Sequence, residues 1–145
     1  MGSWEHGENY RFDILTDLNH WVGGWTDWNM ALNLEGKPNW AGNSDDAPII
    51  IASENQVFYK NPMFYHLGHF SKFSDEGWIV IGGNDSDPNF IYVVLQNDEL
   101  RSIIALNKYN EEIKLVIEDK KMGILDIFVD KRSIQSFMYK YNKSP

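Results

Sequence analysis

Residues 113–129 read IKLVIEDKKMGILDIFV, and this stretch decides the fold class of the C-terminal half of the chain. Ile113, Leu115 and Ile117 occupy every second position, as in a strand that buries one face. Turn residues at 120–123 then interrupt the apolar pattern, and a second run rich in β-branched residues follows. The stretch therefore predicts two strands joined by a short turn.

Short apolar runs separated by turn residues extend over residues 77–145. The turn signals include 82–85 (GGND), and we interpret 84–87 (NDSD) as a hairpin turn, because it lacks the glycine and the terminal glutamate of a calcium loop. Several short strands at this spacing indicate an antiparallel β-sandwich. The predicted strands are Trp78–Ile81, Phe90–Leu95, Ser102–Leu106, Ile113–Ile117, Ile124–Val129 and Ser133–Tyr141.

Residues 1–76 have a different character. Apolar residues recur at i, i+4 and i+7 and predict a helix from about residue 9 to residue 21. A short strand-like piece at 22–29 follows, and then residues 30–46, rich in Asn, Gly and Pro, indicate an irregular excursion. The apolar residues of the helix are Ile14, Leu18 and Trp21.

The segment ends in a strand pair and a second helix. The β-branched run 47–52 has a candidate partner strand at 56–59. Asn61 is the predicted N-cap and Pro62 the first residue of a helix that ends near Phe73. Helix, strand, long insertion and helix cannot close a core alone. This order is typical of one βα unit of a larger barrel, so the predicted fold is mixed α and β and incomplete.

Composition excludes several function classes. Twenty-one acidic and 13 basic residues give a net charge of −8, and without a basic stripe a nucleic-acid partner is not expected. The chain has no cysteine, which excludes thiolate catalysis and disulfides. No apolar run is long enough to cross a bilayer, and the N-terminus as given does not predict a signal peptide.

The stretch 25–29 (WTDWN) combines aromatic and acidic side chains and is the strongest candidate for a binding site. An indole can stack on a sugar ring while a carboxylate accepts hydrogen bonds from the sugar hydroxyls, which indicates a carbohydrate site. Alternatively Trp25 and Trp28 are core residues and Asp27 caps the following turn. The residue types alone favour this second interpretation, because Trp is mostly buried.

No other constellation indicates catalysis or a metal. His66 and His69 are three residues apart on the second predicted helix, but no third ligand has recognisable spacing, so we interpret them as flanking a packed stripe. A retaining glycosidase needs two carboxylates about 5–5.5 Å apart, and the pattern nominates no such pair. We expect no metal and no cofactor.

Three stretches carry a family resemblance: 23–33 (GGWTDWNMALN), 36–40 (GKPNW) and 58–73 (FYKNPMFYHLGHFSKF). They resemble the C-terminal region of lysosomal-type glucosylceramidases in glycoside hydrolase family 30. The resemblance extends over essentially the whole chain. It is specific up to residue 76 and looser in the predicted sandwich.

This resemblance implies a (β/α)8 TIM barrel combined with a β-sandwich. Residues 1–76 would be the C-terminal part of the barrel, including a β-rich excursion at about 29–61, and residues 77–145 the sandwich domain. The family hydrolyses glucosylceramide to glucose and ceramide with retention. Its acid/base and nucleophile glutamates lie on earlier barrel strands, so the chain alone is expected to contain no catalytic residue and to be inactive.

The family's glucose pocket maps onto Asp27 and Trp28, with Asn43 at its edge, and its best-studied members carry an aromatic residue where this chain has Ser44. The resemblance makes Trp28 a candidate donor to a sugar hydroxyl. It implies a membrane glycolipid substrate, a saposin-type activator and an anionic lipid surface as partners, and a lysosomal location for the parent enzyme. A non-catalytic carbohydrate-binding or interaction module derived from the same region is the alternative.

Overall fold

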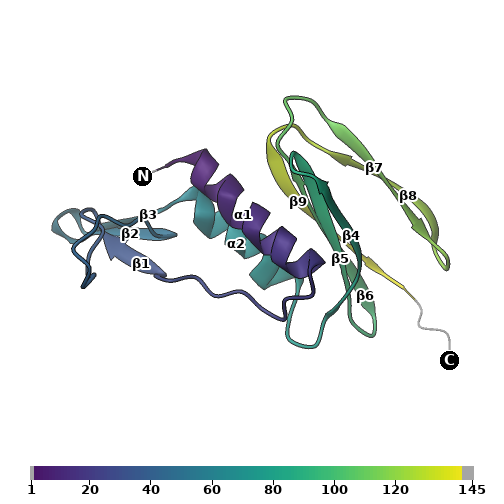
Figure 1. The fold of residues 1–145 in the computed structure, drawn as a ribbon, viewed down its shortest axis with the longest axis horizontal. Coiled ribbons are helices and arrows are strands. Elements are labelled where there is room, and N and C mark those ends of the chain that lie inside the picture. Colours follow the sequence, from purple (N-terminus) through teal and green to yellow (C-terminus); the bar gives the residue numbers. More distant parts are fainter. Residues whose placement is uncertain (1, 142–145) are drawn as a thin grey trace.

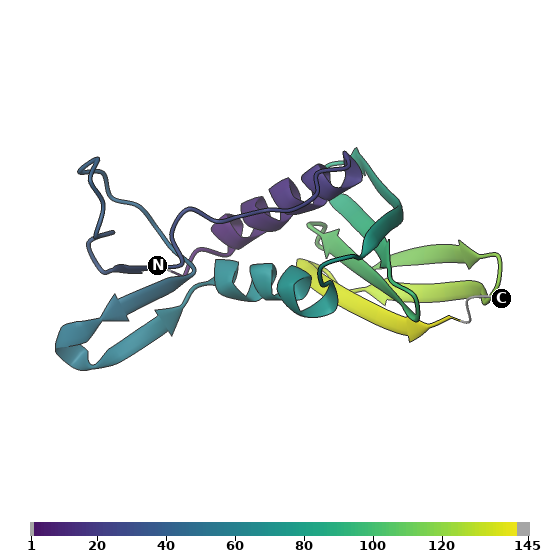
Figure 2. The ribbon, with the colours of Figure 1, turned by 90° about the horizontal axis from the view of Figure 1, so that it is seen from below.

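The computed structural model describes residues 2–141, which contain two α-helices and nine strands. Helices α1 (Trp4–Asn19) and α2 (Pro62–Phe73) lie side by side, with a small sheet at one end and a larger sheet against their other end (Figure 1, Figure 2). A strand pair forms an outer layer beyond the larger sheet. Neither helix is long and apolar enough to cross a membrane. The predicted mixed α and β fold class is confirmed.

Helix α1 begins earlier than the predicted residue 9. Ser3 is its N-cap in an extended conformation, and the Ser3 hydroxyl oxygen accepts a hydrogen bond from the His6 backbone N–H at 3.4 Å. Serine at this position satisfies a donor that the first helical turn leaves free. The helix also ends at Asn19, before Trp21. Of the three predicted apolar positions, Ile14 is buried and Leu18 packs partly against the core, whereas Trp21 lies beyond the helix and is exposed.

The predicted strand at 22–29 is absent. These residues run beside the helices as an extended segment without strand pairing to any described residue. A barrel strand needs hydrogen-bond partners on both sides. Nothing in residues 2–141 supplies them, so the strand-like composition produces no strand here.

The small sheet confirms the predicted strand pair and adds a third strand. Strand β2 pairs antiparallel with β3, and β1, which lies inside the stretch 30–46 predicted to be irregular, pairs parallel with β2. A short 3₁₀ turn, η1 (Ser53–Asn55), joins β2 to β3. The strands are β1 (Ala31–Asn33), β2 (Ile49–Ala52) and β3 (Val57–Lys60).

Asn61 occupies the predicted N-cap position of α2, but its side chain does not cap the helix. Its Nδ2 donates to Asp46 Oδ1 and to the Ala47 carbonyl, both at 2.8 Å, and its Oδ1 accepts from Gly2 N at 3.0 Å. Asn61 is buried. Asn61 therefore links Gly2, ahead of α1, to the end of the excursion. These three hydrogen bonds satisfy its buried amide group.

All six predicted strands of residues 77–145 are present. The order β4-β5-β6-β9 forms an antiparallel sheet, and β7 pairs with β8. Arg101 and Tyr139 of the first sheet both donate to the Asp119 carboxylate at the end of β7, which joins the two layers. The strands are β4 (Ile79–Asp87), β5 (Phe90–Gln96), β6 (Leu100–Asn107), β7 (Ile113–Asp119), β8 (Gly123–Val129) and β9 (Ser133–Lys140).

The turns predicted at 82–85 and 84–87 are wrong, because both segments belong to β4. Two register shifts interrupt the β4–β5 pairing, and the hairpin turn lies at residues 88–89. Gly83 has a packing role, since a Cβ there would lie 2.0 Å from Asn19 Oδ1. The Asn19 Nδ2 donates to the Tyr92 carbonyl at 3.1 Å, so the end of α1 rests directly on the sheet.

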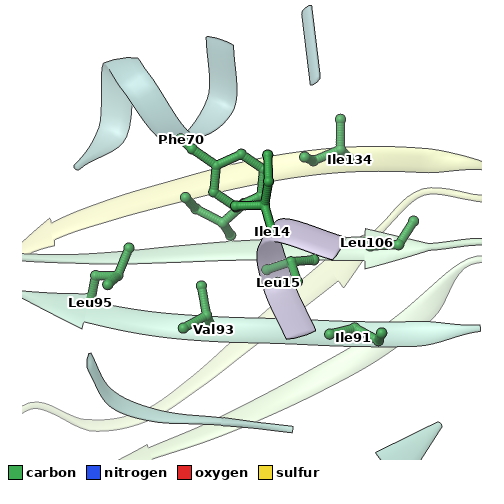
Figure 3. Close-up of a cluster of buried hydrophobic side chains, with 9 residues drawn as sticks. Ile14, Leu15, Phe70, Ile91, Val93, Leu95, Leu106 and Ile134 are labelled. Carbon is green, nitrogen blue, oxygen red and sulfur yellow. The ribbon is translucent and has the colours of Figure 1, made fainter. Parts of the chain in front are cut away.

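Two apolar clusters hold these layers together. The first lies between the helices and the four-stranded sheet, where Ile14 and Leu15 of α1 meet Phe70 of α2 above Val93 and Leu106 (Figure 3). The second lies between the two sheets and includes Val94, Ile103, Leu115 and Val129. The helix pair thus shares one core with the sandwich.

Candidate carbohydrate-binding site

Asp27 lies in the extended segment between α1 and β1. Its Oδ1 accepts hydrogen bonds from the Tyr10 hydroxyl at 2.9 Å and from its neighbour's backbone, Trp28 N, at 2.8 Å. Its Oδ2 is buried and has no hydrogen-bond partner among the described residues. The carboxylate is therefore fixed through one oxygen and retains acceptor capacity on the other.

Tyr10 connects this carboxylate to the core. Burial, together with the hydrogen bond to Asp27, raises the pKa of Tyr10 well above its ordinary value, so the hydroxyl remains a donor. The Tyr10 ring packs edge-on against Trp25 with 5.4 Å between centroids. Trp25 in turn packs against the cluster between the helices and the sheet. A continuous chain of contacts thus positions Asp27.

Trp28 points away from this core. Its side chain is 77% exposed, so the interpretation of Trp28 as a core residue is wrong. The same interpretation holds for Trp25, which packs against the core. Trp28 and Asn29 line a hollow of about 400 Å³. Pro38, Asn39 and Trp40 of the following loop also line it. A hollow of this size falls within the range of small-molecule sites.

Asn43 does not line this hollow. Its Nδ2 donates to Asp45 Oδ1 at 2.9 Å, and its carbonyl accepts from Asn39 Nδ2 at 2.7 Å. Asn43 is therefore linked to the hollow only through Asn39. Of the three predicted site residues, the structure brings Asp27 and Trp28 together and places Asn43 on the supporting loop.

Sequence reasoning missed two residues of this region. Tyr10 lies within the predicted first helix and was not named as a site residue, although its hydroxyl donates to Asp27, 17 residues further along the chain. Trp40 was quoted only as part of the 36–40 stretch, although it lines the hollow. An aromatic residue in a polar, glycine-rich loop is the signal that would have indicated Trp40.

The two helical histidines take part in separate contacts. Burial lowers the pKa of His66 to about 4, and its ring packs edge-on against Trp4 with 4.7 Å between centroids. His69 Nδ1 lies 2.9 Å from Ser136 Oγ on β9. No group of three or more metal-ligating side chains occurs within residues 2–141.

Comparison with known proteins identifies the family. A sequence model of the glycosyl hydrolase family 30 TIM-barrel domain matches residues 1–74. The chain is 41% identical over 142 residues to lysosomal acid glucosylceramidase of Mus musculus, and 42% identical over 148 residues to putative glucosylceramidase 3 of Caenorhabditis elegans. These matches cover 97% and 99% of this chain but 28% of each relative. The chain thus spans less than a third of the curated relatives that it matches.

Solved structures give the same result for the fold. SrfJ from Salmonella typhimurium superposes with a TM-score of 0.84 at 25% identity, over 97% of this chain and 31% of that chain. An endo-β1,6-glucanase superposes with a TM-score of 0.76 at 21% identity, over 95% of this chain and 31% of that chain, which supports the fold alone.

The TIM-barrel family model covers the residues that form the two helices and the small sheet, and antiparallel sheets follow in the rest of the described chain. The matched region of the mouse enzyme is its C-terminal part. The chain therefore belongs to glycosyl hydrolase family 30.

Proposed function

We propose that this chain is the C-terminal part of a retaining β-glucosidase that hydrolyses glucosylceramide to glucose and ceramide. The observation that carries the proposal is the pair Asp27–Trp28, in which a fixed carboxylate with a buried, unpaired Oδ2 is followed by an exposed indole that lines a hollow. The names of the curated relatives, which are glucosylceramidases, support the substrate class.

In this proposal the chain supplies binding groups. Asp27 accepts a hydrogen bond from a glucosyl hydroxyl, since its Oδ2 has no partner among the described residues, whereas its Oδ1 already accepts from Tyr10 and from the Trp28 backbone. The indole N–H of Trp28 donates to another hydroxyl. Asn43 acts at the edge of the site by supporting the loop that carries Asn39.

The reaction itself needs groups that this chain is not expected to supply. Retaining hydrolysis uses one carboxyl as acid and base and a second as nucleophile. The family's two glutamates are expected on earlier barrel strands. Under this proposal the parent enzyme acts in the lysosome on a glycolipid, with a saposin-type activator and an anionic lipid surface as partners.

One observation favours a second candidate, a non-catalytic carbohydrate-binding module. One apolar cluster lies between the helices and the four-stranded sheet, and a second lies between that sheet and the β7–β8 pair. Residues 2–141 therefore bury a core of their own. Such a module would use the same Asp27–Trp28 site without hydrolysis. The two candidates therefore make the same prediction for binding and different ones for catalysis and folding.

Binding of methyl β-D-glucopyranoside to the 145-residue chain tests the site. Trp28→Phe keeps most of the ring area and deletes one donor. At this exposed position the lost hydrogen bond costs about 0.5–1.5 kcal/mol, so the dissociation constant should rise by roughly two- to tenfold. In the complete enzyme, kcat/KM should fall by about one to two orders of magnitude, with little change in Tm.

Trp21→Phe is the matched control, because Trp21 is 78% exposed and does not line the hollow. It should leave the affinity unchanged. Equal effects of the two substitutions, or a stability loss confined to Trp28→Phe with unchanged affinity, would contradict the proposed role of Trp28.

A further inference from the structure

Trp40 is the most exposed of the large hydrophobic side chains in the described part of the chain, at 91%. It belongs to neither apolar cluster between the layers. It lines the hollow together with Trp28, Asn29 and Pro38. A large exposed indole in a loop of polar residues contributes nothing to the core, which raises the question of what it binds.

The loop that carries Trp40 is held by a defined set of hydrogen bonds. Asn39 Nδ2 donates to the Gly36 carbonyl at 2.6 Å and to the Asn43 carbonyl at 2.7 Å, while its Oδ1 accepts from Gly42 N at 2.8 Å. Gly36 has a φ of 73°, and a Cβ there would lie 2.6 Å from the Asp45 backbone. The backbone of the loop that carries Trp40 is therefore held in one conformation by the side chain of Asn39.

The chemistry of the hollow distinguishes between ligand classes. None of its five lining residues is charged. The amide of Asn39 is already used inside the loop, which leaves Asn29 as the amide free to face a ligand. A second sugar would bring several hydroxyls that need partners. Two indoles and a proline ring instead suit an apolar chain.

We propose that Trp40 and Pro38 form an aglycone wall. A β-glucoside with an apolar aglycone binds with its glucosyl ring at Asp27–Trp28 and the first methylenes of its aglycone against Trp40. This inference rests on the proposed function, because the glucosyl ring must occupy the Asp27–Trp28 site. It adds a residue that selects lipid-like glucosides over glucosides with small or sugar aglycones.

The test compares methyl β-D-glucopyranoside, octyl β-D-glucopyranoside below its micellar concentration, and cellobiose on the 145-residue chain. Burial of two or three methylenes against Trp40 should make octyl glucoside bind about tenfold or more tightly than methyl glucoside. The indole N–H signals of Trp28 and Trp40 in NMR spectra should both shift with octyl glucoside. Only that of Trp28 should shift with methyl glucoside.

Trp40→Ala should abolish the octyl preference, so that octyl and methyl glucoside bind with similar affinity. The matched control Trp21→Ala should retain the preference. Because both side chains are largely exposed, neither substitution should alter the circular dichroism spectrum.

The outcomes separate the inference from the proposed function. If Trp28→Phe weakens both glucosides but Trp40→Ala keeps the octyl preference, the aglycone wall is wrong and the glucose site stands. If cellobiose binds more tightly than octyl glucoside, or if Trp40→Ala only converts a dimer into a monomer, the occupant is a second sugar or a second copy of the chain. Absence of binding by all three ligands overturns both proposals.

Discussion

At the scale of single residues, burial decides what each polar side chain does. Asp27 accepts a hydrogen bond from Tyr10 on one carboxylate oxygen, and its other oxygen has no partner among the described residues. The Asn61 amide instead links Gly2, ahead of α1, to residues 46–47 through hydrogen bonds. His66 is a third case, since it is buried beside Trp4 and packs where Gly7 leaves room. A Cβ at Gly7 would lie 2.4 Å from the imidazole ring.

The lowered pKa of His66 predicts a pH dependence of stability. Burial is the main cause of the shift from 6.5 to about 4, and the nearby Arg11 and His69 add to it. Between these values the unfolded chain binds a proton and the folded chain does not. The free energy of unfolding should therefore fall by up to about 3 kcal/mol as the pH drops from 6.5 to 4.

Urea unfolding at pH 7.5 and pH 4.5 measures this effect. His66→Leu should flatten the difference between the two pH values. His20→Gln, at an exposed imidazole, should leave it as it is in the unsubstituted chain. The same pH slope in His66→Leu would show that other groups cause the acid sensitivity.

At the scale of elements, one buried carboxylate joins α1 to the turn between β8 and β9. Glu8 Oε1 accepts from Arg11 Nη2 at 3.2 Å and from Trp4 Nε1 at 3.1 Å, and Glu8 Oε2 accepts from Arg132 Nη2 at 3.0 Å. Arg11 is fully buried, and burial lowers its pKa to about 10. Arg132, whose φ is 49°, lies 124 residues from Glu8.

Loss of the Glu8 carboxylate should destabilise the contact between α1 and the turn that joins β8 to β9. Glu8→Gln leaves a buried guanidinium without its counter-charge, so we expect a loss of about 3–5 kcal/mol in unfolding free energy. Arg132→Met should cost less, because Arg132 is partly exposed. Asp126→Asn, which breaks the exposed pair with Lys114, is the control and should cost less than about 1 kcal/mol. Equal losses in Glu8→Gln and Asp126→Asn would show that the network adds nothing.

At the scale of the whole molecule, the chain should not hydrolyse β-glucosides. The nucleophile and the acid of a retaining glycosidase act together, and without them both the covalent route and leaving-group protonation are lost. A fluorogenic β-glucoside should therefore give the same rate with native and heat-inactivated protein. Turnover well above that background would contradict the assignment of the catalytic groups to other parts of a parent enzyme.

The exposed apolar surface predicts how the isolated chain behaves. Met63 and Phe70 are buried by the chain itself, but every residue of β3 is exposed, as are Ile51 and Tyr65. Such surface and unpaired strand edges favour self-association. We expect concentration-dependent aggregation and binding of hydrophobic dyes, measured by sedimentation and fluorescence. A sharp, cooperative melt from a monomer would instead favour the independent module.

The sequence alone determined the local elements and the family. Alternating apolar residues predicted the strands of residues 77–145 because a half-buried strand repeats every two residues. Helical spacing predicted α2 and the buried face of α1. Turn residues were less informative, since Gly82 and Gly83 form part of β4, where α1 packs too closely for a side chain at Gly83.

Only the tertiary structure decided how the site is built. The roles of Tyr10, Trp40 and Asn61 depend on neighbours distant along the chain or on loop geometry that leaves no periodic signal. The absent strand at 22–29 has the same origin, because a strand requires partners as well as β-forming residues. Local preference is encoded residue by residue, whereas hydrogen-bond pairing and burial are properties of the folded arrangement.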